Sequence, residues 1–199
     1  RQRQMCIRDR SISIKNITKN KMIVSHRYKA RMTPASNQKI LTTLTGLEFL
    51  GPNYKFQTHI YFIDSIDDSG IYKGDIYIDT KGDPSLTSKK IKKVILFFKQ
   101  KGIKEINGNL VINNNYFEKP FYNKKWKSSW KGLSWAPYVS SVAVDNNLYL
   151  KDETLYLTDN PLYLLGVIFK NQMRSNGIKL KGQIPVSYTH LRAHETRFY

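Results

Sequence analysis

The sequence predicts an α+β fold, because helical and strand patterns both occur along the chain without regular β-α-β alternation. Apolar residues recur at helical spacing near residues 34–51, 88–102 and 161–177, and β-rich segments bounded by turn residues lie before and between them. The chain has 199 residues, of which 40% are hydrophobic and 13% aromatic, so it can form one packed domain or two small ones.

Residues 11–33 contain two short strand patterns, SISIKN and KMIVSHRY, joined by a polar turn. The clearest helix follows, because Thr33 can cap it, Pro34 suits its first position and Gly51 can end it. Its apolar side chains keep helical spacing and predict one buried face, made of Ile40, Leu41, Leu44, Leu47 and Leu50.

The middle of the chain predicts a hairpin, a helix and a strand in that order. KFQTHIYFID and GIYKGDIYID are β-rich and are separated by the turn SIDDS. Residues 88–102 predict a helix with Ser88 as its cap, Gly102 as its terminator and an apolar stripe of Ile91, Val94, Ile95 and Phe98. The next strand pattern is NGNLVINNN.

Residues 116–138 are aromatic and irregular, and two strand patterns follow in VSSVAVDNNLYL and ETLYLTDN. Pro161 stands near the start of a last helix, which Gly177 ends. The longest apolar runs, VILFF and LYLLGVIF, are far shorter than the ~20 residues that a bilayer-spanning helix needs. The sequence therefore predicts no transmembrane segment.

The two ends of the chain look foreign to the protein. One permitted coding of Met5–Asp9, ATG TGT ATA AGA GAC, has the reverse complement GTC TCT TAT ACA CAT, which encodes residues 186–190. An inverted repeat in the DNA explains this relation better than chance, and both ends resemble translated adaptors used in sequencing libraries. We therefore interpret residues 1–10 and 186–199 as adaptor-derived and exclude them from the functional reading.

This exclusion changes what the composition implies. The single cysteine, Cys6, is excluded together with His190 and His194, and the remaining His26 and His59 are too isolated to predict a metal site. The rest has 27 Lys and Arg against 13 Asp and Glu, a net charge of +14 compared with +18 for the whole chain. Because the lysines are scattered along the sequence, we attribute the positive net charge to compositional bias and not to a nucleic-acid-binding surface. A polyanionic cell wall is an equally suitable binding partner for a basic chain.

Ser36 and Lys39 lie three positions apart where the first helix begins, so their side chains are expected on one helical face. A serine hydroxyl becomes a good nucleophile only when a base takes its proton, and a lysine can be that base when desolvation or another cation favours its neutral form. The unpaired N–H groups of a helix start also favour the negative charge of acyl transfer. A lone Ser-x-x-Lys is weak evidence, and a helix-start serine beside a solvated lysine is the plainer interpretation.

Five stretches in a fixed order, of which the first contains Ser36 and Lys39, make the pattern more specific. TPASNQKILTTLTGLEFLGPNYKFQT, YKGDIYIDTKGDPSL, KGIKEINGNLVINNNYF and WAPYVSSVAVDNN occur in this order over residues 33–147, and TDNPLYLLGVIFKNQMRSNGIKLKG follows them. Together they resemble the low-molecular-mass penicillin-binding proteins, specifically the D-alanyl-D-alanine carboxypeptidase/endopeptidases of the DacB type. The resemblance implies the N-terminal part of a penicillin-binding-protein/β-lactamase-like transpeptidase domain, with an inserted α+β domain.

This resemblance also implies a chemistry. Ser36 would attack the carbonyl of a terminal D-Ala-D-Ala bond or of a β-lactam, Lys39 would take its proton, and the N–H of Ser36 would form half of an oxyanion hole. Neither a metal nor an organic cofactor enters the scheme. The partners would be peptidoglycan stem peptides, with β-lactams as covalent inhibitors and nucleic acid not expected, and the enzyme would work in the periplasm or elsewhere outside the cytoplasmic membrane.

The sequence also departs from the family pattern. The family uses a Ser-x-Asn and a Lys-Thr-Gly motif, and neither occurs in this chain. Relatives also have a longer stretch where this chain has residues 147–160. We therefore expect a catalytically incomplete fragment, with residues 11–58 as part of the catalytic domain and residues 59–185 as the inserted domain.

A turn aspartate and three tryptophans are further candidates for a functional role. Asp83 in GDP is either a turn former or a substrate-binding residue, and Trp126, Trp130 and Trp135 either line a peptide groove or pack in the core. Of these, Asp83 and Trp126 are our candidates for substrate binding. Two other functions remain open: a serine β-lactamase relative, and a non-catalytic basic module that binds cell-wall polymer or nucleic acid.

Overall fold

The computed structural model describes residues 10–62, 64–117 and 122–187. The chain divides into two compact units, residues 1–54 and residues 55–199. The predicted adaptor-derived ends therefore lie almost wholly outside the described residues. No helix in the described ranges is both long and apolar enough to cross a bilayer.

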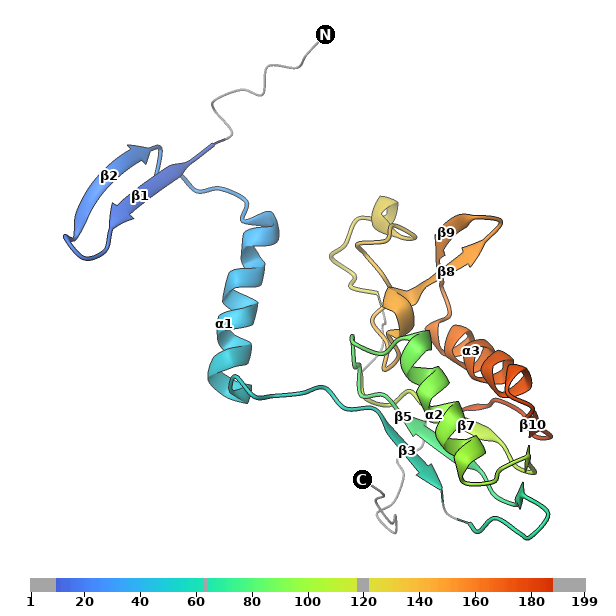
Figure 1. Ribbon diagram of the computed structural model, residues 1–199. Coiled ribbons are helices and arrows are strands. Elements are labelled where there is room, and N and C mark those ends of the chain that lie inside the picture. Colours follow the sequence, from blue (N-terminus) through green and yellow to red (C-terminus); the bar gives the residue numbers. More distant parts are fainter. Residues whose placement is uncertain (1–9, 63, 118–121, 188–199) are drawn as a thin grey trace. The chain divides into compact units, whose positions relative to one another are not determined.

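The described residues of the first unit form a β-hairpin, a 3₁₀ turn and a helix (Figure 1). Strands β1 (Ile12–Asn16) and β2 (Lys21–His26) pair in antiparallel fashion, as the sequence predicts, with an irregularity between Ile14 and Lys15. Helix α1 runs from Gln38 to Leu50 and ends at Gly51, whose φ of 80° suits glycine.

The start of α1 differs from the prediction. A 3₁₀ turn, η2 (Ala35–Asn37), precedes the α-helix, and neither Pro34 nor Asn37 caps its helix through a side chain. The reason is local, because Ala35 has a φ of 44° and interrupts helical geometry between Pro34 and Ser36. Ser36 therefore lies in the 3₁₀ turn rather than in the first turn of an α-helix.

The expected buried face of α1 is not found. No described residue of the first unit is buried. The leucine-rich side of α1 is more than half exposed, from 51% at Leu47 to 67% at Ile40. An amphipathic helix needs a second layer to cover its apolar side. The two strands of the hairpin have eleven residues, nine exposed and two half-buried, and offer too little apolar surface for this.

The second unit is built on a four-stranded mixed sheet with the order β11-β7-β5-β3. Its strands are β3 (His59–Phe62), β5 (Ile76–Asp79), β7 (Leu110–Asn113) and β11 (Val186–Ser187). β3 is antiparallel to β5, which agrees with the predicted hairpin, whereas β5, β7 and β11 are parallel. The parallel β5–β7 pair is joined through a helix, a crossover that the sequence reading did not anticipate.

Two small sheets complete the second unit. β4 (Ile71–Tyr72), β6 (Glu105–Ile106) and β10 (Lys179–Leu180) form a parallel sheet in the order β10-β6-β4. β8 (Leu148–Lys151) and β9 (Thr154–Leu157) form an antiparallel hairpin. The shortened stretch noted in the sequence, residues 147–160, is occupied by this hairpin.

Helices α2 (Ser88–Gln100) and α3 (Pro161–Ser175) pack against each other in the second unit (Figure 1). Thr87, and not Ser88, caps α2 by accepting a hydrogen bond from the Lys90 N–H, and Asn160 caps α3 in the same way. The apolar stripe predicted for α2 is confirmed, because Ile91, Ile95 and Phe98 are buried and Val94 is half-buried.

The core of the second unit combines the apolar sides of both helices with the sheet. It includes Ile76 and Ile78 of β5, Leu110 and Ile112 of β7, and Leu165, Phe169 and Met173 of α3. Three glycines allow neighbouring backbones to approach closely beside this core. A Cβ on Gly108 would collide with the Gly74 carbonyl, and a Cβ on Gly182 would collide with the Gly108 carbonyl.

Candidate active site

Ser36 and Lys39 lie at the junction of η2 and α1. Ser36 is the middle residue of the 3₁₀ turn, and Lys39 is the second residue of the α-helix. The turn is closed by a hydrogen bond of 2.9 Å from the Asn37 N–H to the Pro34 carbonyl. Both side chains are exposed.

Two features of this junction are relevant to acyl transfer. The hydroxyl and the amine belong to neighbouring helical turns, and the backbone N–H groups at a helix start favour a developing negative charge. A lysine base also requires desolvation or a neighbouring cation. Because Lys39 is exposed, the described residues of the first unit do not by themselves supply that desolvation.

Asp83 occupies a turn directly after β5 and is 4% exposed. Its Oδ1 accepts hydrogen bonds from the N–H and the hydroxyl of Ser85, at 2.8 and 2.6 Å, and its Oδ2 accepts one of 3.1 Å from the Thr58 hydroxyl. Burial alone raises the pKa of Asp83. The hydrogen bonds from Ser85 and Thr58 and the charge of Lys90 have the opposite and larger effect, so the pKa lies below its ordinary value of 3.8. Its oxygens are thus engaged within the chain.

Trp126 belongs to an aromatic loop, residues 122–138, in which rings pack on one another. Its ring lies 5.0 Å from that of Tyr122 in an edge-to-face contact, and Tyr122 also contacts Tyr138 at 5.6 Å. The Tyr122 hydroxyl is buried and has no hydrogen-bond partner within the described residues, and burial together with the charge of Tyr138 raises the pKa of Tyr122. Trp126 is half-buried, whereas Trp135 is 62% exposed.

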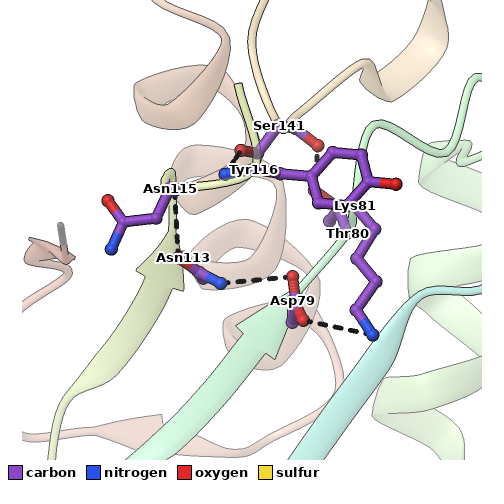
Figure 2. A network of polar contacts seen from close by, with 7 residues as sticks. All are labelled: Asp79, Thr80, Lys81, Asn113, Asn115, Tyr116 and Ser141. Atoms are coloured by element: carbon purple, nitrogen blue, oxygen red, sulfur yellow. Dashed lines mark hydrogen bonds and ion pairs between the residues drawn. The ribbon is translucent and has the colours of Figure 1, made fainter. Parts of the chain in front are cut away.

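The segment that follows the aromatic loop is fixed to the sheet by Ser141 (Figure 2). The Ser141 hydroxyl accepts a hydrogen bond of 3.2 Å from the Tyr116 N–H, which precedes the loop. The Ser141 carbonyl accepts bonds from the Gly82 N–H, at 2.8 Å, and from the Thr80 hydroxyl. Ser141 therefore connects the loop with the turn that carries Asp83.

A second polar contact lies at the carboxyl ends of the parallel strands. Figure 2 shows Asp79 between Asn113 and Lys81. The Asn113 side-chain amide donates to Asp79 at 3.3 Å, and the Lys81 ammonium lies 3.8 Å from the other Asp79 oxygen. These contacts join the end of β5 to the end of β7, from which the aromatic loop departs.

Asp145 connects the next segment to α2. Its carboxylate accepts from the Ser88 N–H, with oxygen distances of 3.1 and 3.2 Å, at the start of that helix. Asp145, Asn146 and Asn147 all have positive φ, between 47° and 60°, a left-handed conformation that Asp and Asn tolerate best. This turn directs the chain from the sheet into the β8–β9 hairpin.

Among the predicted residues, the structure links the turn of Asp83 to the loop of Trp126. The turn of Asp83 and the loop of Trp126 belong to the second unit and are linked through Ser141, whereas Ser36 and Lys39 belong to the first unit. The sequence reading assigned no role to Ser141, Asp79 or Asp145. The Ser-Ser and Asp-Asn-Asn runs after the aromatic loop were the available signal, because such residues favour turns with side-chain hydrogen bonds.

The fold is similar to that of solved penicillin-binding proteins. Penicillin-binding protein 4 (dacB) from Haemophilus influenzae matches 93% of this chain with a TM-score of 0.78 and 18% identity, and the match covers 55% of that chain. The same protein complexed with a β-lactam matches with a TM-score of 0.66 and 18% identity, covering 93% of this chain and 53% of the other. Mixed α and β architecture is therefore shared with this class of protein.

A family model of the D-Ala-D-Ala carboxypeptidase 3 (S13) family matches residues 7–156, and the chain belongs to this family. Among curated relatives, D-alanyl-D-alanine carboxypeptidase DacB of Haemophilus influenzae is 27% identical over 135 residues, 68% of this chain and 28% of that protein. The D-alanyl-D-alanine carboxypeptidase of Actinomadura sp. (strain R39) is 23% identical over 114 residues, 57% of this chain and 21% of that protein. The chain thus spans about a quarter of the length of these relatives.

The family resemblance predicted from ordered motifs is therefore confirmed, and so is the predicted mixture of α and β structure. The roles of individual residues are a separate question, because the comparisons concern the chain as a whole.

The hydrogen bonds to Asp83 predict a pH-dependent stability. Because folding lowers its pKa, ionised Asp83 stabilises the folded state above pH 3.8, and this stabilisation is lost as the pH falls below 3.8 through the folded pKa. Asp83→Asn is expected to lower the free energy of unfolding by about 1–3 kcal/mol at pH 7 and by less at pH 3. Urea unfolding followed by tryptophan fluorescence measures both values.

Asp68→Asn, at an exposed acid in another turn, is the matched control and should change little at either pH. An equal loss of stability by Asp83→Asn at pH 7 and pH 3 would contradict this account of the charge.

The contacts of Ser141 predict that its hydroxyl restrains the aromatic loop. Ser141→Ala removes the acceptor for the Tyr116 N–H, so the loop should open more often and trypsin should cleave it about 3- to 10-fold faster. Mass spectrometry of early digests detects cleavage after Lys124, Lys125, Lys127 and Lys131. Ser129→Ala, inside the loop and exposed, should digest like the parent chain, and unchanged cleavage in Ser141→Ala would refute the restraint.

Proposed function

We propose that this chain carries the nucleophile and the base of a serine-type D-Ala-D-Ala carboxypeptidase/endopeptidase that acts on peptidoglycan. The observation that carries the proposal is the Ser-x-x-Lys of residues 36–39 at a helix start, inside the segment that matches the S13 family. The names of the relatives, both D-alanyl-D-alanine carboxypeptidases, support the same reaction.

The reaction proceeds by acyl transfer. Ser36 Oγ attacks the carbonyl carbon of the penultimate D-Ala while Lys39 Nζ takes the hydroxyl proton. The bond to the terminal D-Ala nitrogen then breaks, and that nitrogen receives the proton from Lys39. Water hydrolyses the resulting ester and regenerates Ser36. The Ser36 N–H contributes to stabilising the oxyanion, and the scheme requires neither a metal nor an organic cofactor.

The proposed partners follow from this chemistry. Stem peptides of peptidoglycan are the substrates, and β-lactams acylate Ser36 because their strained amide presents the same type of carbonyl. One similar structure contains a β-lactam, which is consistent with this proposal. Peptidoglycan lies outside the cytoplasmic membrane, so we place the working enzyme in the periplasm or an equivalent compartment.

For Asp83 and Trp126, the two candidates for substrate binding, we propose different roles, and only Trp126 would contact the substrate directly. Trp126 is half-buried within a packed aromatic loop and can offer a ring to a stem peptide. Asp83 is buried and hydrogen-bonded by Ser85 and Thr58, so its contribution is to hold the turn to which Ser141 attaches the loop. We further propose that residues 11–58 belong to the catalytic domain and residues 59–185 to an inserted domain.

We also propose that the 199-residue chain alone is catalytically incomplete. Ser-x-Asn and Lys-Thr-Gly, which the family resemblance requires for proton relay and substrate binding, do not occur in it. Lys39 is exposed in the described structure, so the first unit does not supply the desolvated surroundings that a lysine base requires.

The purified chain is therefore expected to release no D-alanine from an acyl-D-Ala-D-Ala peptide or depsipeptide above the rate of the buffer. A coupled D-amino-acid oxidase assay measures this release, and Ser36→Ala provides the baseline. Ready turnover by the chain, abolished in Ser36→Ala, would contradict the proposed incompleteness and support the proposed nucleophile. The rival interpretation, a basic binding module, instead predicts salt-sensitive retention on DNA that survives Ser36→Ala.

A further inference from the structure

The second unit contains a cavity of about 690 Å³ between the edge strand β3 and helix α2. This volume lies within the range of about 300–1,000 Å³ that is typical of small-molecule sites. β3 contributes Ile60 and Phe62 to its lining, and α2 contributes Val94, Phe97 and Phe98. The cavity is distant in sequence from Ser36 and Lys39, and the acyl-transfer scheme does not use it.

The lining changes from apolar to cationic. Tyr72, Phe98 and Ile103 are buried and form an apolar floor, in which Phe62 contacts Phe98 edge to face at 4.9 Å. Lys93 and Lys101 also line the cavity, but they are exposed. The depth of the cavity thus suits a hydrocarbon or an aromatic ring, and its outer side suits a negative charge.

Lys93 belongs to α2, and Lys101 is the C-cap residue that directly follows this helix. Lys93, Phe97 and Lys101 are spaced by four residues, so their side chains follow one helical face, and the Lys101 ammonium lies 5.5 Å from the centre of the Phe97 ring. Within the described residues, neither ammonium lies within 4.0 Å of a carboxylate oxygen. These two cations are therefore available to an external anion.

The acid that lines the cavity does not neutralise this side. Asp64 is also part of the lining, and its carboxylate lies beside the backbone of Gly74. Two cations against one anion leave a net positive charge around an apolar interior. This combination is complementary to a molecule with an apolar body and one anionic end.

We propose that the cavity between β3 and α2 binds a free, single-chain amphiphilic anion, such as a medium-chain carboxylate. The hydrocarbon chain occupies the floor formed by Phe62, Phe98 and Ile103, and the carboxylate pairs with Lys93 and Lys101. This binding is independent of the proposed acyl transfer, because it uses no residue of the Ser-x-x-Lys segment.

Isothermal titration of the 199-residue chain with decanoate tests the proposal. Decanoate should bind saturably, and butyrate, which has the same charge and lacks the apolar body, should bind at least tenfold more weakly. The double variant Lys93→Gln/Lys101→Gln should weaken decanoate binding roughly tenfold, because it removes two charge-assisted contacts. Both substitutions are at exposed positions, so the fold should persist.

Lys89→Gln/Lys92→Gln is the matched control. It removes the same charge from exposed positions of the same helix, but neither residue lines the cavity. Decanoate affinity should stay within about twofold of the parent chain. Equal weakening by both double variants would overturn the proposal, because it would indicate diffuse attraction to a basic helix.

Methyl NMR locates the bound ligand. Decanoate should shift the methyl signals of Val94 and Ile103, and this shift would support the assigned cavity. Shifts confined to the exposed leucines of α1, or no saturable binding at all, would overturn it. The chain could instead bind phosphatidylglycerol vesicles in preference to free decanoate, with both double variants weakening that binding equally. This result would identify a membrane surface as the partner and would also overturn the proposal.

Discussion

The described structure depends on burying the apolar sides of two helices against a mixed sheet, and this condition is met only in the second unit. There α2 and α3 share one core with β5 and β7, and its isoleucine, leucine and phenylalanine side chains are almost fully buried. The polar contacts of Ser141, Asp79 and Asp145 then fix the loops that leave this core. A rigid sheet that presents an aromatic loop at one end and a cavity beside its edge strand is the result.

The first unit carries the residues that define the proposed chemistry, but its described residues form no buried core. The leucine-rich side of α1 is exposed, and Ser36 and Lys39 are exposed at its start. The proposed reaction needs a desolvated site, because desolvation favours a neutral lysine and keeps water away from an acyl-enzyme. Residues that cover this helix have to provide that desolvation. Family membership and the proposed incompleteness are therefore compatible, because the helix and its Ser-x-x-Lys would form only one part of the proposed active site.

The sequence predicted features governed by local periodicity and motifs. The stripe of Ile91, Ile95 and Phe98 predicted the buried side of α2, and the ordered motifs predicted the family. It did not predict the parallel β5–β7 pairing, because pairing between distant strands leaves little local pattern. The prediction for the start of α1 was wrong, because Ala35 adopts a left-handed φ that is unusual for alanine. The role of Ser141 was not predicted, because its hydrogen-bond partners lie 25 and 61 residues away in the sequence.

Hydrogen exchange of backbone amides tests most directly the claim that the proposed nucleophile and base, Ser36 and Lys39, lie at the start of a helix for which the first unit provides no core. An isolated helix of 13 residues is marginally stable in water. The amides of Leu41–Leu50 should therefore exchange no more than a few tens of times more slowly than unprotected amides. The amides of Ile91–Phe98 in α2, a helix of the same length packed on the sheet, should be protected about a thousandfold or more. Protection of α1 equal to that of α2 would mean that this chain covers the helix by itself, and the account of an incomplete active site would be wrong.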